Sequence, residues 1–439
     1  MLMLQARFSA YLTNSAWMLA EQFLRLVSGV LVGIYIARYL GPEQFGVLNY
    51  VLAITAFVFV IARLGMDAVL VRELAQHADN AGKLLGTAMT LMLLAALVCY
   101  FLMVSVLIFV SEPLLIKGYI ALAGASVFLA AFYAFDFYFQ ARVKAKLGAI
   151  VKCIVISFMV LIKIVMLWRD VPLLGFVVVH LIEHFLIAIG LGIMFFRNRP
   201  PALDLAFDGG FIKPLLQSAW PMLLAGLSSL LYMRVDQLML RHMVDMEAVG
   251  IYSAASRIYE AWILFPFVLS VSLLPALVAL KKRSPQRFEM RLQQLFSVLI
   301  ACSMFAALIA WLFGDVLMLA TFGRSYQESV VPLQLLMVAA IFTAVHSVTI
   351  RYLTVQHREI KVASRTLIAA LLNFVANALL IPIYGPQGAA LATLITMFFI
   401  AYVMDYLDAD LRQLARIKRL ALLPTYFWKG KEHGGDGHL

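Results

Sequence analysis

The chain has 439 residues, of which 64% are hydrophobic and only 13% charged, and its mean hydropathy is +0.93. This composition excludes a soluble globular protein and indicates a membrane protein with many spans. No basic domain or RNA-binding signature accompanies the net charge of +11, so we assign the charge to basic loops beside a membrane and not to nucleic-acid binding.

Apolar stretches along the chain predict twelve membrane-spanning helices. Each stretch is at least about as long as the ~20 residues that a helix needs to cross a bilayer, whereas barrel strands would alternate in polarity. We therefore expect an all-α integral membrane protein whose first apolar run is an uncleaved helix. The predicted spans are 15–37, 46–70, 84–110, 115–138, 149–168, 172–196, 215–240, 248–278, 293–320, 331–355, 362–383 and 386–406.

The Lys and Arg residues between the spans predict the orientation. If the N-terminus is cytoplasmic, 23 of the 35 Lys and Arg residues, including Arg365 and Lys418, lie in cytoplasmic segments or at the span ends next to them. Five lie in loops or at span ends on the other side, and seven lie deeper within spans. Because cytoplasmic loops carry the excess of positive charge, we expect both termini in the cytoplasm. The loops are too short to fold as an extramembrane domain.

Sequence matches at a nearly constant offset indicate a duplicated six-helix unit. NSAW at 14–17 corresponds to QSAW at 217–220, and GVLNY at 46–50 corresponds to GIYS at 250–253. Copies with six spans each share one orientation and are related by an axis along the membrane normal. The predicted domains are an N-terminal six-helix bundle at 1–196, a cytoplasmic linker at 197–214, a C-terminal six-helix bundle at 215–406 and a cytoplasmic tail at 407–439.

Charged residues within the spans mark the candidate site, because a charge at bilayer depth is costly and usually faces an interior or a wet cavity. Three cation–acid pairs lie three or four residues apart and so share a helix face: Glu21–Arg25, Arg63–Asp67 and Arg257–Glu260. Each pair could neutralise itself and hold helices together. Alternatively, the arginines could face a polar cavity and bind a large anion, since guanidinium bonds two phosphate oxygens at once and keeps its proton.

Further charged residues lie nearer the ends of the spans. Arg234 and Asp236 belong to the seventh span, with Arg234 near its outer end. Lys152 lies near the cytoplasmic end of the fifth span, where we expect its side chain to snorkel to the interface. Asp136, near the inner end of the fourth span, is also expected at the interface.

Three other motifs have competing explanations. Asn373 and Asn377 share a face of the eleventh span and could bind sugar hydroxyls or hold helices together. His180, Glu183 and His184 match the spacing of a zinc peptidase motif, but no third ligand is evident, and we expect a polar patch that faces the bundle. The three cysteines lie at unrelated spacings and predict neither a disulfide framework nor a zinc site.

Several longer motifs follow one another along the chain. They are ARYLGPEQFG at 37–46, LGMD at 64–67, VREL at 71–74, YMRVDQ at 232–237, GIYSAA at 250–255 and IPIYGPQGAA at 381–390. As a set, these motifs resemble the Wzx-type polysaccharide flippases of the multidrug/oligosaccharidyl-lipid/polysaccharide exporter superfamily. The resemblance runs from about Asn14 to the twelfth span.

The resemblance implies twelve helices in two pseudo-symmetric bundles around a cationic central cavity. It implies a non-enzymatic flippase of the bacterial inner membrane, without a cofactor, that moves undecaprenyl-diphosphate-linked oligosaccharide to the periplasmic leaflet by alternating access, as in O-antigen synthesis. Its partners would be this glycan lipid, membrane lipid and a polysaccharide polymerase complex. We assign substrate binding to Arg25, Arg63, Arg234, Arg257, Asn373 and Asn377, and ion coupling to Glu21, Asp67, Asp236 and Glu260.

Three alternative functions stay open. A drug or cation antiporter of the same superfamily would favour a cavity dominated by carboxylates, whereas cations within these spans are at least as many as acids. A lipid II flippase would usually carry further helices beyond the twelfth. A membrane glycosyltransferase or polymerase would need a sizeable periplasmic loop, which the predicted spans do not leave.

Overall fold

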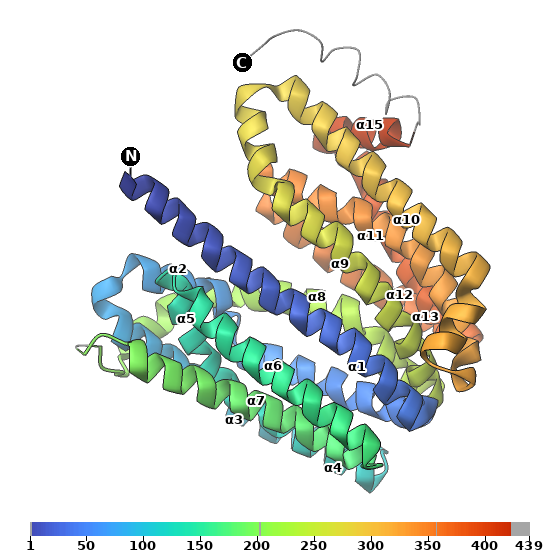
Figure 1. Cartoon of the computed structure of the whole chain (residues 1–439), viewed down its shortest axis with the longest axis horizontal. Coiled ribbons are helices and arrows are strands. Elements are labelled where there is room, and N and C mark those ends of the chain that lie inside the picture. Colours follow the sequence, from blue (N-terminus) through green and yellow to red (C-terminus); the bar gives the residue numbers. More distant parts are fainter. Residues whose placement is uncertain (1, 202, 357, 423–439) are drawn as a thin grey trace. The chain divides into compact units, whose positions relative to one another are not determined.

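The computed structural model describes residues 2–201, 203–356 and 358–422, and all regular elements in these ranges are helical (Figure 1). The predicted tail is therefore described only as far as residue 422. The α-helices are α1 Leu2–Ala62, α2 Met66–Gln76, α3 Ala81–Phe109, α4 Leu114–Gly124, α5 Ala134–Ala141, α6 Ala145–Trp168, α7 Leu173–Asn198, α8 Ile212–Met243, α9 Met246–Arg283, α10 Pro285–Thr321, α11 Val330–Val355, α12 Glu359–Tyr384, α13 Pro386–Phe398, α14 Met404–Leu407 and α15 Arg412–Ala421. A 3₁₀ segment, Ala125–Tyr133, joins α4 to α5, and a π-helix, Phe399–Val403, joins α13 to α14.

Eleven helical stretches among the described residues are long and apolar enough to cross a membrane, which confirms the prediction of an all-α membrane protein. The first stretch, Thr13–Gln76, contains the first two predicted spans. Gly41 separates them with a φ of 74°, a conformation that only glycine adopts readily, and Pro42 follows it. In Figure 1, α1 accordingly runs away from the N-terminus and then turns back. The described residues therefore contain twelve spans.

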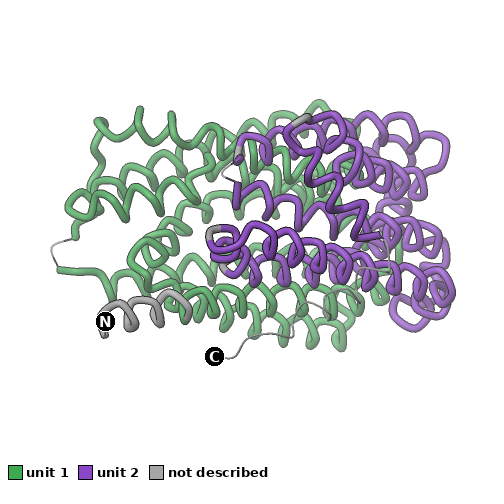
Figure 2. Tube along the Cα trace, turned by 90° about the horizontal axis from the view of Figure 1, so that it is seen from above, with its two compact units in different colours: residues 1–238 green, residues 239–439 purple. Residues whose placement is uncertain are grey.

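The chain divides into two compact units, residues 1–238 (unit 1) and residues 239–439 (unit 2), shown in different colours in Figure 2. The division lies within α8, because the first part of this helix packs on unit 1: a Cβ added to Gly226 would contact Val60 of α1 at 3.5 Å. In unit 1, α1 also packs against α3, α4 and α6. The predicted domain boundaries stay a prediction.

The segment between α7 and α8 is bound to the start of α3. The Asp208 backbone N–H donates to the Thr87 hydroxyl at 2.9 Å, and Lys83 forms an ion pair with Asp208 at 3.2 Å. The backbones also approach closely, since a Cβ added to Gly86 would lie 2.4 Å from the carbonyl oxygen of Ala206. This segment is therefore part of the surface of unit 1.

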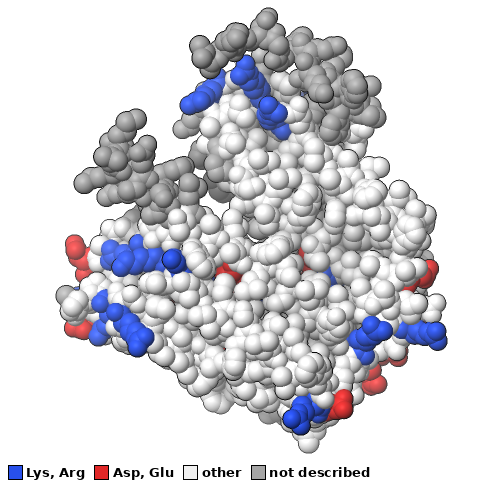
Figure 3. Space-filling view, in the orientation of Figure 1, with Lys and Arg blue, Asp and Glu red and all other residues white. Residues whose placement is uncertain are grey.

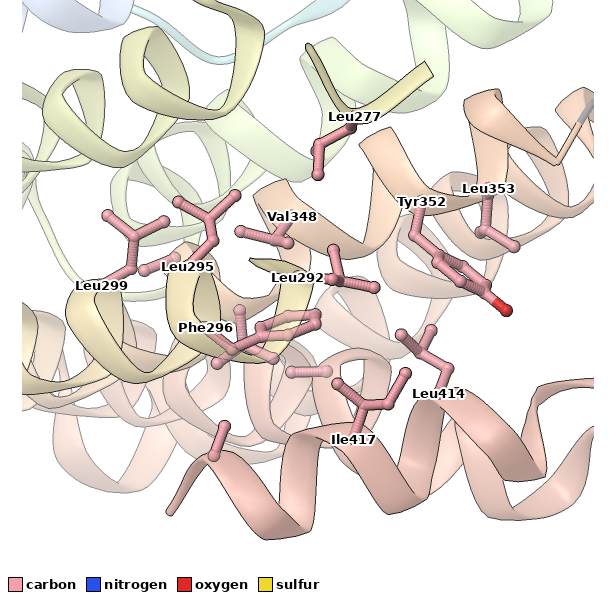
Figure 4. Close-up of a cluster of buried hydrophobic side chains, with 14 of the residues drawn as sticks. Leu277, Leu292, Leu295, Phe296, Leu299, Val348, Tyr352, Leu353, Leu414 and Ile417 are labelled. Carbon is pink, nitrogen blue, oxygen red and sulfur yellow. The ribbon is translucent and has the colours of Figure 1, made fainter. Parts of the chain in front are cut away.

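Unit 2 has an apolar core around α11, which packs against α9, α10 and α13. Phe296 of α10, Val348 and Leu353 of α11, and Leu414 and Ile417 of α15 are buried together (Figure 4). The helix α15 lies in the predicted tail, beyond the last span, so part of that tail is bound to the bundle.

The surface has the character expected of helices in a bilayer. Leu102 and Val106 on α3, and Leu308 and Leu312 on α10, are at least half exposed although they are strongly apolar. On the face shown in Figure 3, most Lys, Arg, Asp and Glu lie toward the margins, a few show near the middle, and broad areas carry no charge. Such large apolar areas are suited to contact with lipid and would be unfavourable in water.

Candidate functional site

A polar cavity of about 770 Å³ lies within unit 1, among the membrane-spanning helices. Its charged lining consists of four cations and two acids: Arg25, Arg63, Arg72, Lys152, Asp67 and Asp136. Three of these residues, Arg25, Arg63 and Asp67, belong to the site predicted from the sequence. Aromatic rings and His184 complete much of the wall.

A break between α1 and α2 places Arg63 and Asp67 at the cavity. The second predicted span is not continuous, because Leu64 and Gly65 have φ angles of 53° and 69°. A Cβ added to Gly65 would lie 2.4 Å from the backbone nitrogen of Leu223, so only glycine lets α8 approach this point. The LGMD motif therefore produces the break between α1 and α2 and also allows α8 to pack closely against it.

Arg63 pairs with Asp67 at 2.8 Å, as their spacing predicts. Its guanidinium also lies over three aromatic rings, with 5.3 Å to the centroid of Phe137 and 5.5 Å to that of Tyr133. Such cation–π contacts fix the plane of the guanidinium. The Arg63 Nε is buried and has no partner among the described residues, so this side chain retains donor capacity within the site.

A second network joins α1, α5 and α6. Arg25 donates to Glu21 through Nε at 3.0 Å and Nη2 at 2.7 Å, which confirms that these two residues pair. Lys152 lies between two carboxylates, 3.2 Å from Glu21 and 3.0 Å from Asp136. The Arg25 side chain is 44% exposed, so one edge of its guanidinium faces the opening while the other is held by Glu21.

Two expectations about this network are wrong. Lys152 does not snorkel to the interface, and Asp136 does not lie at the interface, since they are 9% and 4% exposed and bind each other. A signal for their contact exists in the sequence. Asp136 and Lys152 lie seven and nine residues on either side of Val143, in the turn between α5 and α6, so two antiparallel helices bring them to a similar depth.

The HxxEH motif contributes a polar patch beside the cavity. Glu183 forms an ion pair with Lys163 of α6 at 2.9 Å. The Nδ1 atom of His184 lies 3.0 Å from the backbone carbonyl of His180, and its ring packs edge-on against Phe59. These contacts agree with a patch that faces the bundle. In the part of the chain that the structure describes, no group of three His, Cys, Asp or Glu side chains is arranged to hold a metal ion.

The other predicted site residues lie outside this cavity's lining. Asp236 is buried near the end of unit 1, and Arg234 is partly buried beside it. Arg257 and Glu260, both partly buried, belong to α9 in unit 2. Arg234 and Asp236 thus belong to unit 1 and Arg257 and Glu260 to unit 2, and the roles of these four residues stay predictions.

Asn373 and Asn377 are both fully buried within unit 2. The Asn377 Nδ2 donates to the Asn373 Oδ1 at 3.0 Å. Among the described residues, the Asn373 Nδ2 and the Asn377 Oδ1 have no partner. This geometry supports a role in packing helices, and the binding of sugar hydroxyls stays a prediction.

A buried charge cluster in unit 2 was not predicted. Arg365 and Lys418 both bind Asp405, and all three side chains are 2% exposed or less. The π-helix supplies two further acceptors, the carbonyl oxygens of Ile400 for Arg365 and of Ala401 for Lys418. Burial lowers the pKa of Lys418 to about 8, against the opposing effect of Asp405. The expectation that Arg365 and Lys418 are loop and tail charges is wrong, because they are core residues.

Comparison with known proteins adds a family and a fold. A family model described as "Polysaccharide biosynthesis protein" matches residues 11–281, more than half of the chain. The structure is similar to that of the lipid II flippase MurJ in an inward closed conformation, with a TM-score of 0.73 and 14% identity over 97% of this chain and 94% of that one.

Multidrug transporters have a similar structure. An inward-facing MATE family transporter of the MOP superfamily has a TM-score of 0.71 and 15% identity, over 90% of this chain and 95% of that one. A MATE structure in a bent conformation has a TM-score of 0.59 and 15% identity, over 94% of this chain and 97% of that one. At sequence identities this low, the structural similarity is evidence for the fold alone. A search among curated proteins finds no match.

Proposed function

We propose that the chain, which belongs to the family of polysaccharide biosynthesis proteins, is a membrane transporter of the flippase type. In this proposal it moves undecaprenyl-diphosphate-linked oligosaccharide from the cytoplasmic to the periplasmic leaflet. It does so by alternating access, without catalysis, for the synthesis of a surface polysaccharide. The sugar head cannot cross hydrocarbon with its hydroxyls unsatisfied, so a protein must provide a polar passage.

The observation that carries this proposal is the cationic cavity of unit 1. Four cations and two acids line it, and Arg63 keeps a buried Nε without a partner among the described residues. Arginine suits a diphosphate because its planar guanidinium binds phosphate oxygens in pairs. In our proposal Arg25 and Arg63 bind the diphosphate, Arg234 and Arg257 are further substrate-binding cations, and Asn373 and Asn377 contact the glycan.

The acids next to the arginines are the candidates for coupling to an ion. Asp67 is the most accessible of those in the cavity, with 52% of its side chain exposed, whereas Glu21 is held by both Arg25 and Lys152. We therefore favour Asp67 over Glu21 as a group that exchanges protons or sodium during transport. Asp236 and Glu260 are further candidates for the same role.

The excess of Lys and Arg in one set of loops supports an orientation with both termini in the cytoplasm, in the inner membrane of a bacterium. A polysaccharide polymerase complex on the periplasmic side would then receive the translocated lipid. This topology is open to direct test by labelling single cysteines in the loops from either side of the membrane.

Substitution of the arginines tests the proposal. We expect Arg25→Ala and Arg63→Ala each to reduce surface glycan in cells that still make the protein, and the quadruple substitution with Arg234→Ala and Arg257→Ala to abolish it. Lysine at Arg63 should restore only part of the activity, because lysine cannot bind two phosphate oxygens in one plane. The control is Arg197→Ala, at an exposed position near the end of α7. Full glycan display by the quadruple variant would overturn the proposal.

The similarity of the fold to MurJ makes a lipid II flippase the second candidate. Removal of the gene distinguishes the two functions. Loss of surface polysaccharide with normal growth supports our proposal, whereas arrest of cell-wall synthesis supports transport of lipid II. A change in drug susceptibility alone would support an antiporter instead.

A further inference from the structure

An apolar groove of about 970 Å³ lies on unit 1 between α1 and α6. Its lining is mostly aliphatic and aromatic, with Ser28, Ser157 and Arg38 as the polar members, and it includes Leu31 and Tyr35 of α1 and Leu161 and Trp168 of α6. These four side chains are 55–82% exposed, so the groove is open to a ligand along its length. The function proposed above does not use this surface.

The groove begins beside the polar cavity along both helices. On α1, Leu24 at the start of the groove directly precedes Arg25 of the cavity. On α6, Ser157 of the groove follows Lys152 of the cavity by five residues. The Glu21–Lys152 ion pair shows that the two helices are in register at this level. A molecule with its anionic group at Arg25 could therefore extend an apolar chain directly into the groove.

The length of the groove indicates which kind of chain fits. Its lining runs from Leu24 to Tyr39 on α1, and fifteen residues of helix span about 22 Å. One leaflet accounts for only about half of the ~30 Å hydrocarbon core, so the acyl chain of an ordinary phospholipid would fill only part of this length. A chain that enters from one leaflet and continues past the bilayer centre would fill it.

We propose that this groove binds the first part of the polyprenyl tail while the diphosphate lies against Arg25 and Arg63. The inference rests on the proposed function, because it takes the lipid-linked glycan as the ligand. The tail gains little from leaving lipid, which is as apolar as leucine, so binding depends on van der Waals contact with the groove. The groove orients the amphiphile so that its head enters the polar cavity.

The test fills the groove and varies the length of the tail. Leu31→Trp and Leu161→Trp add bulk at side chains that are 55% and 61% exposed. The matched controls are Leu94→Trp and Leu102→Trp on α3, where the leucines are 54% and 63% exposed. Binding of undecaprenyl diphosphate and of farnesyl diphosphate to the purified full-length chain is measured by mass spectrometry of the retained lipid.

We expect the wild type to bind the long-chain diphosphate about tenfold more tightly than the short one. The groove variants should lose most of this preference, because the long lipid loses more contact with the groove than the short one, and the α3 controls should keep it. An unchanged preference in both groove variants, with both lipids still dependent on Arg25, would overturn the groove inference and leave the proposed function standing. If neither diphosphate binds, or if Arg25→Ala has no effect on either, the proposed substrate class is wrong and the inference is wrong with it.

Discussion

Replacing Lys152 with methionine removes the cation that two buried carboxylates share. Lys152 lies 3.0 Å from Asp136 and 3.2 Å from Glu21, and all three residues are less than 10% exposed. Removal of one partner from a buried ion pair costs about 3–5 kcal/mol, because the remaining charge has lost both water and its partner. For a unit of this size, 1 kcal/mol corresponds to about 2–4 °C, so the melting temperature should fall by on the order of 10 °C.

The assay is thermal unfolding of the purified protein in detergent, together with the amount of protein in the membrane. The matched control is Lys144→Met, because Lys144 lies at the start of the same helix but is exposed. Adding Asp136→Asn to Lys152→Met should recover at least half of the loss, since Glu21 still has Arg25 as a partner. A Lys152→Met protein as stable as the control would refute this account of the network.

Four further substitutions test other parts of the structure. Asp405→Asn should cost about 3–5 kcal/mol because it leaves Arg365 and Lys418 as two buried cations, whereas Lys418→Met leaves a neutral pair and should cost less than half as much in the same unfolding assay. Gly65→Ala should lower transport at normal protein levels, since its Cβ would collide with the α8 backbone next to the cavity. Gly86→Ala should displace the segment between α7 and α8 and speed its cleavage in limited proteolysis, and cleavage at the wild-type rate would contradict the close packing described here.

The membrane-spanning fold was predictable because the bilayer sets the length of each apolar run. The pair Glu21–Arg25 was predictable for a similar reason, since helix geometry alone places residues four apart on one face. Arg63 and Asp67 also form an ion pair, but across the break at Leu64 and Gly65 and not along a continuous helix. Both inferences use only local geometry. They fail where the local geometry itself breaks, as between α1 and α2, where the close approach of α8 decides the conformation.

Contacts between helices were less predictable because they depend on how each helix is rotated about its axis. Lys152 is adjacent in space to Glu21 and Asp136, but the sequence does not show which face of α6 is turned toward them. The cluster of Arg365 and Lys418 was harder still to predict. It depends on carbonyl groups that a π-helix directs toward these cations, and no spacing of apolar residues encodes that distortion.

The central claim is that the arginines of the unit 1 cavity carry the diphosphate head across the membrane. The most direct measurement is translocation of undecaprenyl-diphosphate-linked oligosaccharide in proteoliposomes that contain only this protein, compared among wild type, Arg25→Ala with Arg63→Ala, and Arg197→Ala. We predict that wild type and Arg197→Ala translocate the lipid at similar rates and that the double variant is at least tenfold slower. Translocation by the double variant at the wild-type rate would contradict the claim.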